Sequence, residues 1–181
     1  AKIVDFDYAE VMAYVHKKIA TIAPHDSQER FEKMGVKIIR HYAKFKDNKT
    51  VIAGQNEINA RRTVIATGSR AKIPNIVGLD TVKYLTNETL FDLRKAPQHL
   101  AILGGGPIGM EMAQAHARLG IKTTLIEING ILQHYEPRFI EPVAKSLIDD
   151  GVRILENTVV DRVEQDGTNI NLYLNSGETL L

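Results

Sequence analysis

The sequence contains no cysteine among its 181 residues. This absence excludes disulfide scaffolds, thiolate metal sites and thiol nucleophiles from this stretch. No run approaches the roughly 18 apolar residues that a membrane-spanning helix requires, and the N-terminus lacks the basic-then-apolar pattern of a signal peptide. We therefore expect a soluble, cytoplasmic protein that has no membrane partner.

Neither sign of charge dominates, since Lys and Arg total 23 and Asp and Glu total 22, for a net charge of +1. This balance gives no electrostatic reason to expect a nucleic-acid partner. The 6 histidines show no spacing typical of a zinc site, so no metal is expected. The chain begins without Met and stops at Leu181 inside a strand-like run, so both ends read as cut.

The N-terminal part reads as helical over residues 7–34, with a break at Pro24. Short strand-like runs follow at residues 36–40, 50–53 and 62–66. They suggest a small antiparallel insertion that leads into a strand over residues 63–67. Residues 72–79, which contain Pro74 and Gly78, read as a linker.

The second part alternates strand and helix patterns. Apolar strands are predicted at residues 100–103, 122–126 and 152–155, and helices at residues 107–119 and 137–150. Alternation of this kind predicts an α/β fold with a Rossmann-type parallel βαβαβ sheet. Two runs of alternating character around Asp166 and Gly167 then predict an antiparallel β-meander.

A glycine loop joins the first of these strands to its helix. Gly104, Gly106 and Gly109 have the spacing G-x-G-x-x-G, with Pro107 and Ile108 between the last two. The first glycine permits the tight turn, the second lets a pyrophosphate approach the backbone, and the third allows close helix–strand packing. The N-terminus of the following helix offers N–H groups and partial positive charge to the phosphates. The sequence therefore predicts a dinucleotide site here, against the alternative of a purely structural turn.

Glu127 ends the next strand, 18 residues beyond Gly109 in the sequence. A carboxylate at this place can accept hydrogen bonds from the adenosine ribose hydroxyls and repels a 2′-phosphate. The position therefore favours NAD over NADP. The alternative is a solvated carboxylate at a strand end.

Several blocks together resemble the pyridine nucleotide-disulfide oxidoreductase family, which includes dihydrolipoamide dehydrogenase, glutathione reductase and mercuric reductase. The blocks are Thr-Val-Ile-Ala-Thr-Gly-Ser-Arg at residues 63–70, Tyr-Leu-Thr-Asn at residues 84–87, and Leu-Gly-Gly-Gly-Pro-Ile-Gly-Met-Glu at residues 103–111. The sequences of residues 80–93 and 106–120 are most similar to the mercuric-reductase-like branch of the family.

The resemblance implies an internal fragment of a larger enzyme. Residues 1–70 would be a partial FAD-binding domain segment, and residues 71–181 an NAD(P)-binding domain truncated before its last strand. The Cys-x4-Cys redox pair and the dimerisation domain of the family would lie outside this chain. The full-length parent would be a homodimer, and this fragment alone would be inactive.

The resemblance also assigns roles to individual residues. Those expected to contact FAD are Ala43, Thr67, Gly68 and Ser69. Glu111 matches a catalytic glutamate that faces the flavin and the nicotinamide, although a glutamate here is also an ordinary helix residue. Val160 matches a position that lines the adenine pocket, although an apolar strand residue is more often core. Residues 41–45, which include Ala43, otherwise read as only a short strand.

The implied activity is transfer of hydride from NADH to FAD and then to a disulfide or small-molecule substrate. The sequence does not indicate the final acceptor. One alternative is a non-catalytic NAD-binding or redox-sensing Rossmann module. A second is a classical NAD dehydrogenase, which needs a catalytic His or a Tyr-x-x-x-Lys pattern that we do not find.

Overall fold

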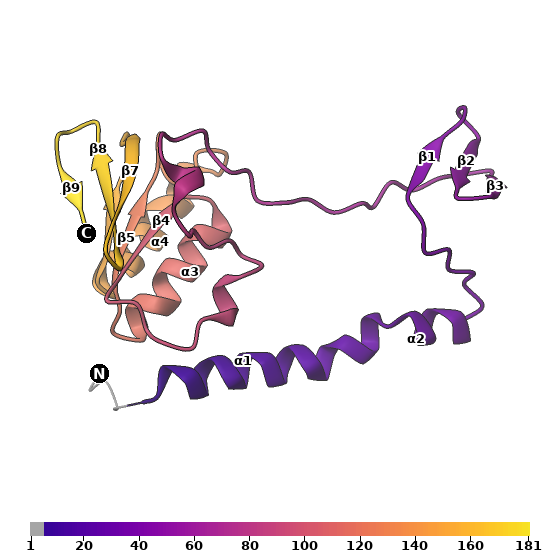
Figure 1. Ribbon diagram of the computed structural model, residues 1–181, viewed down its shortest axis with the longest axis horizontal. Coiled ribbons are helices and arrows are strands. Elements are labelled where there is room, and N and C mark those ends of the chain that lie inside the picture. Colours follow the sequence, from indigo (N-terminus) through magenta and orange to yellow (C-terminus); the bar gives the residue numbers. More distant parts are fainter. Residues whose placement is uncertain (1–5) are drawn as a thin grey trace. The chain divides into compact units, whose positions relative to one another are not determined.

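The structure is a computed structural model that describes residues 6–181. The chain divides into two compact units, one made of residues 14–71 and the other of residues 72–181 together with residues up to Ala13. Helix α1 (Tyr8–Ile22) contributes residues to both units. Figure 1 shows the order of elements along the chain. No helix within residues 6–181 is both long and apolar enough to cross a membrane.

The helical run breaks at the expected proline. After α1, Pro24 lies in the short 3₁₀ turn η1 (Ala23–Asp26), and α2 (Gln28–Lys33) follows. The Ser27 hydroxyl caps α2 by accepting a hydrogen bond from the Arg30 backbone N–H at 3.3 Å. Such a cap satisfies one of the donors that a helix N-terminus leaves free.

The unit of residues 14–71 also holds a three-stranded antiparallel sheet. Its strands β1 (Ala43–Phe45), β2 (Thr50–Ala53) and β3 (Asn56–Asn59) pair in the order β1-β2-β3. In the turn after β1, the Asp47 carboxylate accepts the Lys49 and Thr50 backbone N–H groups, each at 2.8 Å. These bonds hold the pKa of Asp47 below its usual range. A small antiparallel sheet is present as expected, but of the runs expected to form it only residues 50–53 take part.

The strands expected at two places in this unit are wrong. Residues 36–40, 62–66 and 63–67 adopt no strand. Val64 and Ile65 are 86% and 72% exposed, and no described strand pairs with them. An apolar, β-branched run matches a strand pattern, but a strand also needs a neighbour for its backbone groups.

The larger unit is built on the expected parallel sheet. Strands β4 (His99–Leu103), β5 (Lys122–Ile126) and β6 (Val152–Leu155) pair in the order β4-β5-β6. Helices α3 (Pro107–Arg118) and α4 (Pro137–Asp149) connect them. All three strands therefore direct their carboxyl ends to one edge, with Leu103 beside Ile126 and Ile126 beside Leu155. The predicted α/β fold is confirmed.

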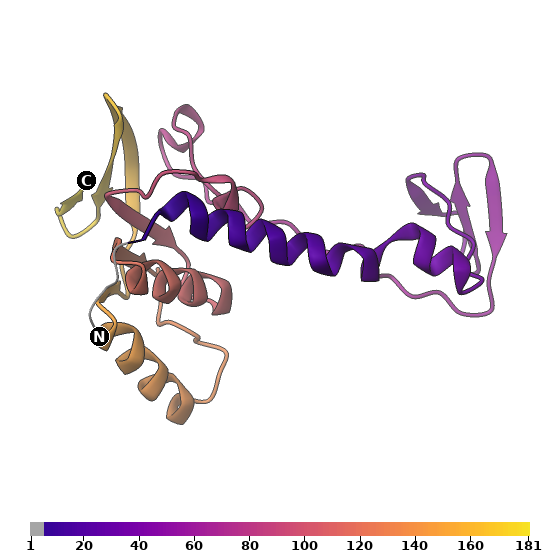
Figure 2. The ribbon, with the colours of Figure 1, turned by 90° about the horizontal axis from the view of Figure 1, so that it is seen from below.

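The two faces of this sheet pack against different layers. Leu125, which is fully buried, packs with residues of α3 and α4. Its neighbour Ile126 packs on the opposite face against the meander, which consists of β7 (Val160–Asp166), β8 (Asn169–Leu174) and β9 (Thr179–Leu180). The short turn η2 (Leu79–Thr81) joins this second core, whereas η3 (Leu90–Asp92) lies further along the chain. Figure 2 shows the helices and the meander on opposite sides of the sheet.

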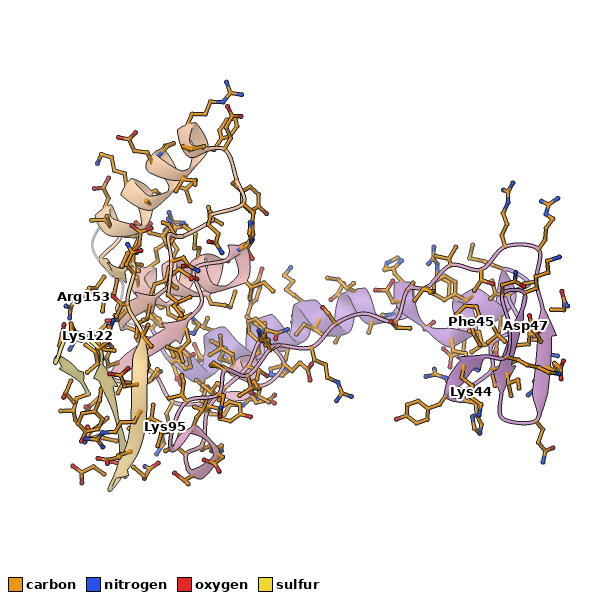
Figure 3. All side chains as sticks on the ribbon, turned by 90° about the horizontal axis from the view of Figure 1, so that it is seen from above. Lys44, Phe45, Asp47, Lys95, Lys122 and Arg153 are labelled. Atoms are coloured by element: carbon orange, nitrogen blue, oxygen red, sulfur yellow. The ribbon has the colours of Figure 1, made fainter. Side chains whose placement is uncertain are left out.

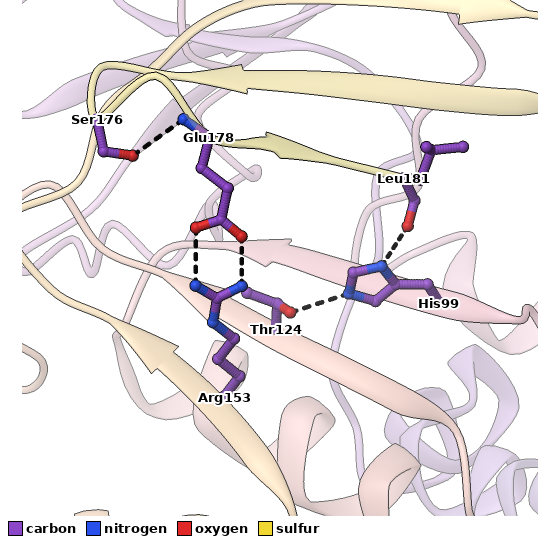
Figure 4. A network of polar contacts seen from close by, with 6 residues as sticks. All are labelled: His99, Thr124, Arg153, Ser176, Glu178 and Leu181. Atoms are coloured by element: carbon purple, nitrogen blue, oxygen red, sulfur yellow. Dashed lines mark hydrogen bonds and ion pairs between the residues drawn. The ribbon is translucent and has the colours of Figure 1, made fainter.

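Polar contacts tie the meander to the parallel sheet (Figure 4). The Arg153 guanidinium donates to both carboxylate oxygens of Glu178, at 2.5 and 2.7 Å. His99 bridges the Leu181 carbonyl and the Thr124 hydroxyl. Arg153 and Lys122, labelled in Figure 3, both lower the pKa of Glu178, and the hydrogen bonds from Arg153 have the larger effect. The ion pair thus joins the turn before β9 to β6.

Candidate functional site

The glycine loop lies at the carboxyl end of β4, where its geometry explains two of its glycines. Gly104 has φ +112°, a left-handed conformation that favours glycine. A Cβ on Gly109 would lie 2.0 Å from the Gly104 carbonyl oxygen. Such a contact is impossible, so Gly109 allows the first turn of α3 to pack directly on the turn that leaves β4.

Gly106 has a different environment. It is the N-cap of α3, Pro107 occupies the first turn, and a Cβ built on Gly106 would meet no atom within 4 Å. The side of Gly106 that a side chain would occupy is therefore open. Ile108, in the same turn, is 59% exposed. The N-terminus of α3 thus presents backbone N–H groups to an accessible surface, which suits an anionic group.

The middle residue of the motif, Gly105, also has a structural role that the sequence analysis missed. It is buried, and a Cβ there would lie 2.7 Å from Ile131 Cγ2 and 3.1 Å from Glu127 Cβ. The G-x-G-x-x-G pattern treats this position as free. The only signal in the sequence is the unbroken run of glycines at residues 104–106.

Glu127 is joined directly to this loop. Its Oε2 accepts the Gly105 backbone N–H at 2.6 Å, and its Oε1 accepts the Asn129 backbone N–H at 3.0 Å. A carboxylate offers about four lone-pair sites. Glu127 therefore anchors the glycine loop and keeps capacity for further donors.

A hollow of about 160 Å³ opens beside this pair. Its lining consists of Gly105, Gly106, Pro107, Glu127, Gly130, Leu132, Gln133, His134 and Tyr135. The residues from Gly130 onward were not singled out from the sequence, and their position shortly after Glu127, at the end of β5, is the signal that could have found them. In open parallel sheets, ligands bind outside the carboxyl ends of the strands. This hollow lies at the carboxyl ends of β4 and β5.

The other expected site residues lie elsewhere. Glu111 is exposed on α3, beyond the glycine loop. Val160 is 7% exposed within the core that includes Ile126, and it does not line the hollow.

The residues expected to contact flavin are exposed members of the other unit. Ala43 lies in β1, and Thr67, Gly68 and Ser69 lie in a stretch without regular structure. Among the described residues, no group of three or more His, Asp or Glu side chains could hold a metal ion.

The parallel sheet, its two crossover helices and the glycine turn define an α/β protein of the Rossmann type. The family model of the pyridine nucleotide-disulphide oxidoreductases matches residues 8–181. The chain therefore belongs to this family, as its sequence blocks predicted.

Individual relatives agree with this assignment. The chain is 40% identical over 134 residues to the mercuric reductase of Bacillus cereus, covering 74% of this chain and 21% of that protein. It is 32% identical over 171 residues to the mercuric reductase of Lysinibacillus sphaericus, covering 94% of this chain and 31% of that protein. The chain thus spans between a fifth and a third of the length of these curated relatives.

A solved structure supports the same fold. The HOCl-induced flavoprotein disulfide reductase RclA from Escherichia coli superposes with a TM-score of 0.79 at 25% identity, covering 97% of this chain and 41% of that one. The similarity extends over nearly all of the chain.

Proposed function

We propose that this chain is the NAD(H)-binding core of an FAD-dependent pyridine nucleotide-disulfide oxidoreductase. In the whole enzyme, hydride would pass from NADH to FAD and then to a disulfide or small-molecule substrate. The observation that carries this proposal is the hydrogen bond between Glu127 and the Gly105 backbone, beside the open face of Gly106.

The residues at this place suit a dinucleotide. The pyrophosphate would lie against Gly106 and the first turn of α3, where backbone N–H groups and the helix dipole favour negative charge. The adenosine ribose would lie at Glu127, within the hollow that both residues line. The bound cofactor supplies the hydride, and the protein supplies distance and orientation.

Glu127 supports a preference for NAD over NADP. Its carboxylate already accepts two backbone N–H groups, and its remaining lone pairs can accept ribose hydroxyls. A 2′-phosphate brought to the same place would meet a fixed negative charge. Repulsion at short range in a partly buried site weakens binding of the phosphorylated cofactor.

FAD is the proposed second cofactor of the full-length enzyme. Gly68 has φ +70°, and a Cβ there would meet no atom within 4 Å. The turn of Thr67, Gly68 and Ser69 therefore leaves its backbone open to a flavin, with Ala43 proposed at the adenine. Glu111, exposed on α3, is proposed to face the flavin and the nicotinamide.

Calorimetric titration of the chain with NADH and with NADPH tests the central proposal. We expect NADH to bind more tightly than NADPH. Equal affinities would overturn the role of Glu127, and failure of both cofactors to bind would overturn the nucleotide site. We also expect no reductase turnover from this chain, because it contains no cysteine to accept electrons as a disulfide.

The competing function is a non-catalytic NAD-binding or redox-sensing module. It would use the same glycine loop without flavin. Expression of the full-length gene separates the two, since a flavoenzyme gives a yellow preparation that absorbs in the flavin region. A colourless preparation that binds NADH would favour the sensing module.

A further inference from the structure

The loop after β5 is held in place by a residue at the end of the next strand. Glu156 directly follows β6, and its Oε1 accepts the Ile131 backbone N–H at 2.7 Å. The adjacent Asn157 backbone N–H donates to the Asn129 carbonyl at 3.0 Å. Residues 129–131 are therefore fixed from the side opposite to the glycine loop.

This loop carries the wall of the hollow. Ile131 is 3% exposed, and the next residue, Leu132, lines the hollow. Leu132 has φ +49°, a left-handed conformation that a branched side chain rarely adopts. Its backbone N–H donates to the Gly105 carbonyl at 3.0 Å. An unfavourable backbone conformation persists only where the surroundings fix it, and here hydrogen bonds on both sides do so.

Two carboxylates at neighbouring strand ends thus accept hydrogen bonds from different parts of these loops. Glu127 holds the glycine loop and the start of the loop after β5, through Gly105 and Asn129. Glu156 holds the Ile131 end of that loop. Glu127 lines the hollow, whereas Glu156 does not.

We propose that Glu156 is a positioning residue for the adenosine half of the dinucleotide. It fixes the loop of residues 128–132 through the Ile131 N–H and so sets the wall that faces the adenosine. This inference rests on the proposed nucleotide site. It adds a residue that acts without touching the cofactor, and the property that matters is its hydrogen-bond acceptor and not its charge.

Three variants separate the acceptor from the charge. Glu156→Ala removes both, Glu156→Gln keeps an acceptor oxygen without the charge, and Glu141→Ala removes an exposed carboxylate of α4 as a matched control. Each is titrated calorimetrically with NADH, ADP-ribose and reduced nicotinamide mononucleotide. Glu156→Ala should weaken NADH and ADP-ribose on the order of five-fold, the equilibrium equivalent of one net hydrogen bond. Mononucleotide binding should not change.

We expect Glu156→Gln to bind NADH within about two-fold of the unmodified chain, because one retained acceptor preserves most of the interaction. Glu141→Ala should match the unmodified chain. Equal losses in the Gln and Ala variants would show that charge matters instead, and would overturn the positioning role. Unchanged NADH binding in Glu156→Ala would overturn it as well. Failure of the unmodified chain to bind NADH would overturn the nucleotide site itself.

Amide hydrogen exchange gives a readout that requires no cofactor. Loss of the Glu156 acceptor should raise the exchange rate of the Ile131 amide in Glu156→Ala and leave it near the original rate in Glu156→Gln. Exchange in the core of β5 should stay slow in both variants, which separates a local effect from unfolding. An Ile131 amide that exchanges at the same rate in the unmodified chain, Glu156→Ala and Glu156→Gln would overturn the proposal.

Discussion

The Glu127 carboxylate lies 2.6 Å from the backbone nitrogen of Gly105, so the acidic end of β5 and the glycine loop after β4 form one hydrogen-bonded unit. A side chain at position 105 would collide with Glu127 Cβ and with Ile131. The carboxylate that we propose for the ribose and the turn that we propose for the pyrophosphate are thus placed relative to each other without a cofactor. Such preorganisation reduces the cost of ordering groups on binding.

Replacing Glu127 should change both affinity and specificity. Glu127→Ala removes the ribose acceptors and releases the Gly105 and Asn129 N–H groups. Hydrogen bonds to charged groups contribute about 1.5–3 kcal/mol, so NADH affinity should fall roughly ten-fold to a hundred-fold. NADPH should lose less, because a repulsive charge is removed at the same time. Calorimetry with both cofactors measures the change in their ratio, and an unchanged ratio would contradict the assignment.

Substitution by alanine should mainly lower the stability of the fold at Gly109 and mainly weaken NADH binding at Gly106. Gly109→Ala places a Cβ 2.0 Å from the Gly104 carbonyl oxygen, so the free energy of unfolding should fall by at least about 1–3 kcal/mol. Gly106→Ala meets no atom within 4 Å and should cost no more than about 1 kcal/mol. It should nevertheless weaken NADH binding, because the added methyl group occupies the open face.

Urea unfolding and NADH titration of both variants check this pair. Each variant serves as the control for the other, since the change in side-chain volume is the same. A Gly106→Ala chain that binds NADH as tightly as the original would mean that the pyrophosphate does not approach this face.

The parallel sheet could be predicted from the sequence because its signals are local. The apolar run that forms β5 and the helix that begins at Pro107 both carry their periodicity in adjacent residues. The run of residues 63–67 carries a similar signal, yet Val64 is 86% exposed and unpaired with any described strand, because pairing depends on residues distant in sequence.

The candidate site likewise has features that the sequence predicts and features that it does not. The roles of Gly104 and Gly109 follow from a known spacing, and the structure gives each a geometric reason. The contacts of Gly105 and Glu156 each join a backbone N–H to a carboxylate across neighbouring strand ends, and their partners Glu127 and Ile131 lie 22 and 25 residues away in the sequence. No periodicity encodes such contacts.

The ion pair between Arg153 and Glu178 should make the attachment of the meander sensitive to acid. The hydrogen bonds from Arg153 hold the folded-state pKa of Glu178 below its usual value of 4.5. The stabilisation is therefore complete above that value and is lost as the pH falls through the lower, folded-state pKa. Both side chains are solvent-accessible, so the effect should be small and should weaken with added salt.

Thermal unfolding of the original chain and of Glu178→Gln between pH 7 and pH 3 measures this contribution. The difference between their melting temperatures should be largest near neutrality and should shrink towards pH 3. A difference that stays constant over this range would show that the Glu178 side chain stabilises the chain without its charge.

The buried hydrogen bond between Tyr8 and His116 should contribute more to stability than the exposed ion pair of Arg153 and Glu178. His116 is 2% exposed, and its Nδ1 lies 2.8 Å from the Met112 carbonyl oxygen, which can only accept. Nδ1 therefore carries the proton, and in the neutral ring Nε2 accepts the Tyr8 hydroxyl at 3.2 Å. Burial raises the pKa of Tyr8, so its hydroxyl keeps its proton at neutral pH and donates it to this bond.

Tyr8→Phe removes the donor and leaves Nε2 of His116 buried without it. A buried polar atom that loses its partner costs about 1–3 kcal/mol, so the free energy of unfolding should fall by that amount in urea denaturation at pH 8. Tyr14→Phe is the matched control, because Tyr14 lies on the same helix, is 59% exposed, and should change stability by less than about 0.5 kcal/mol. Equal effects of the two substitutions would show that the hydrogen bond contributes nothing.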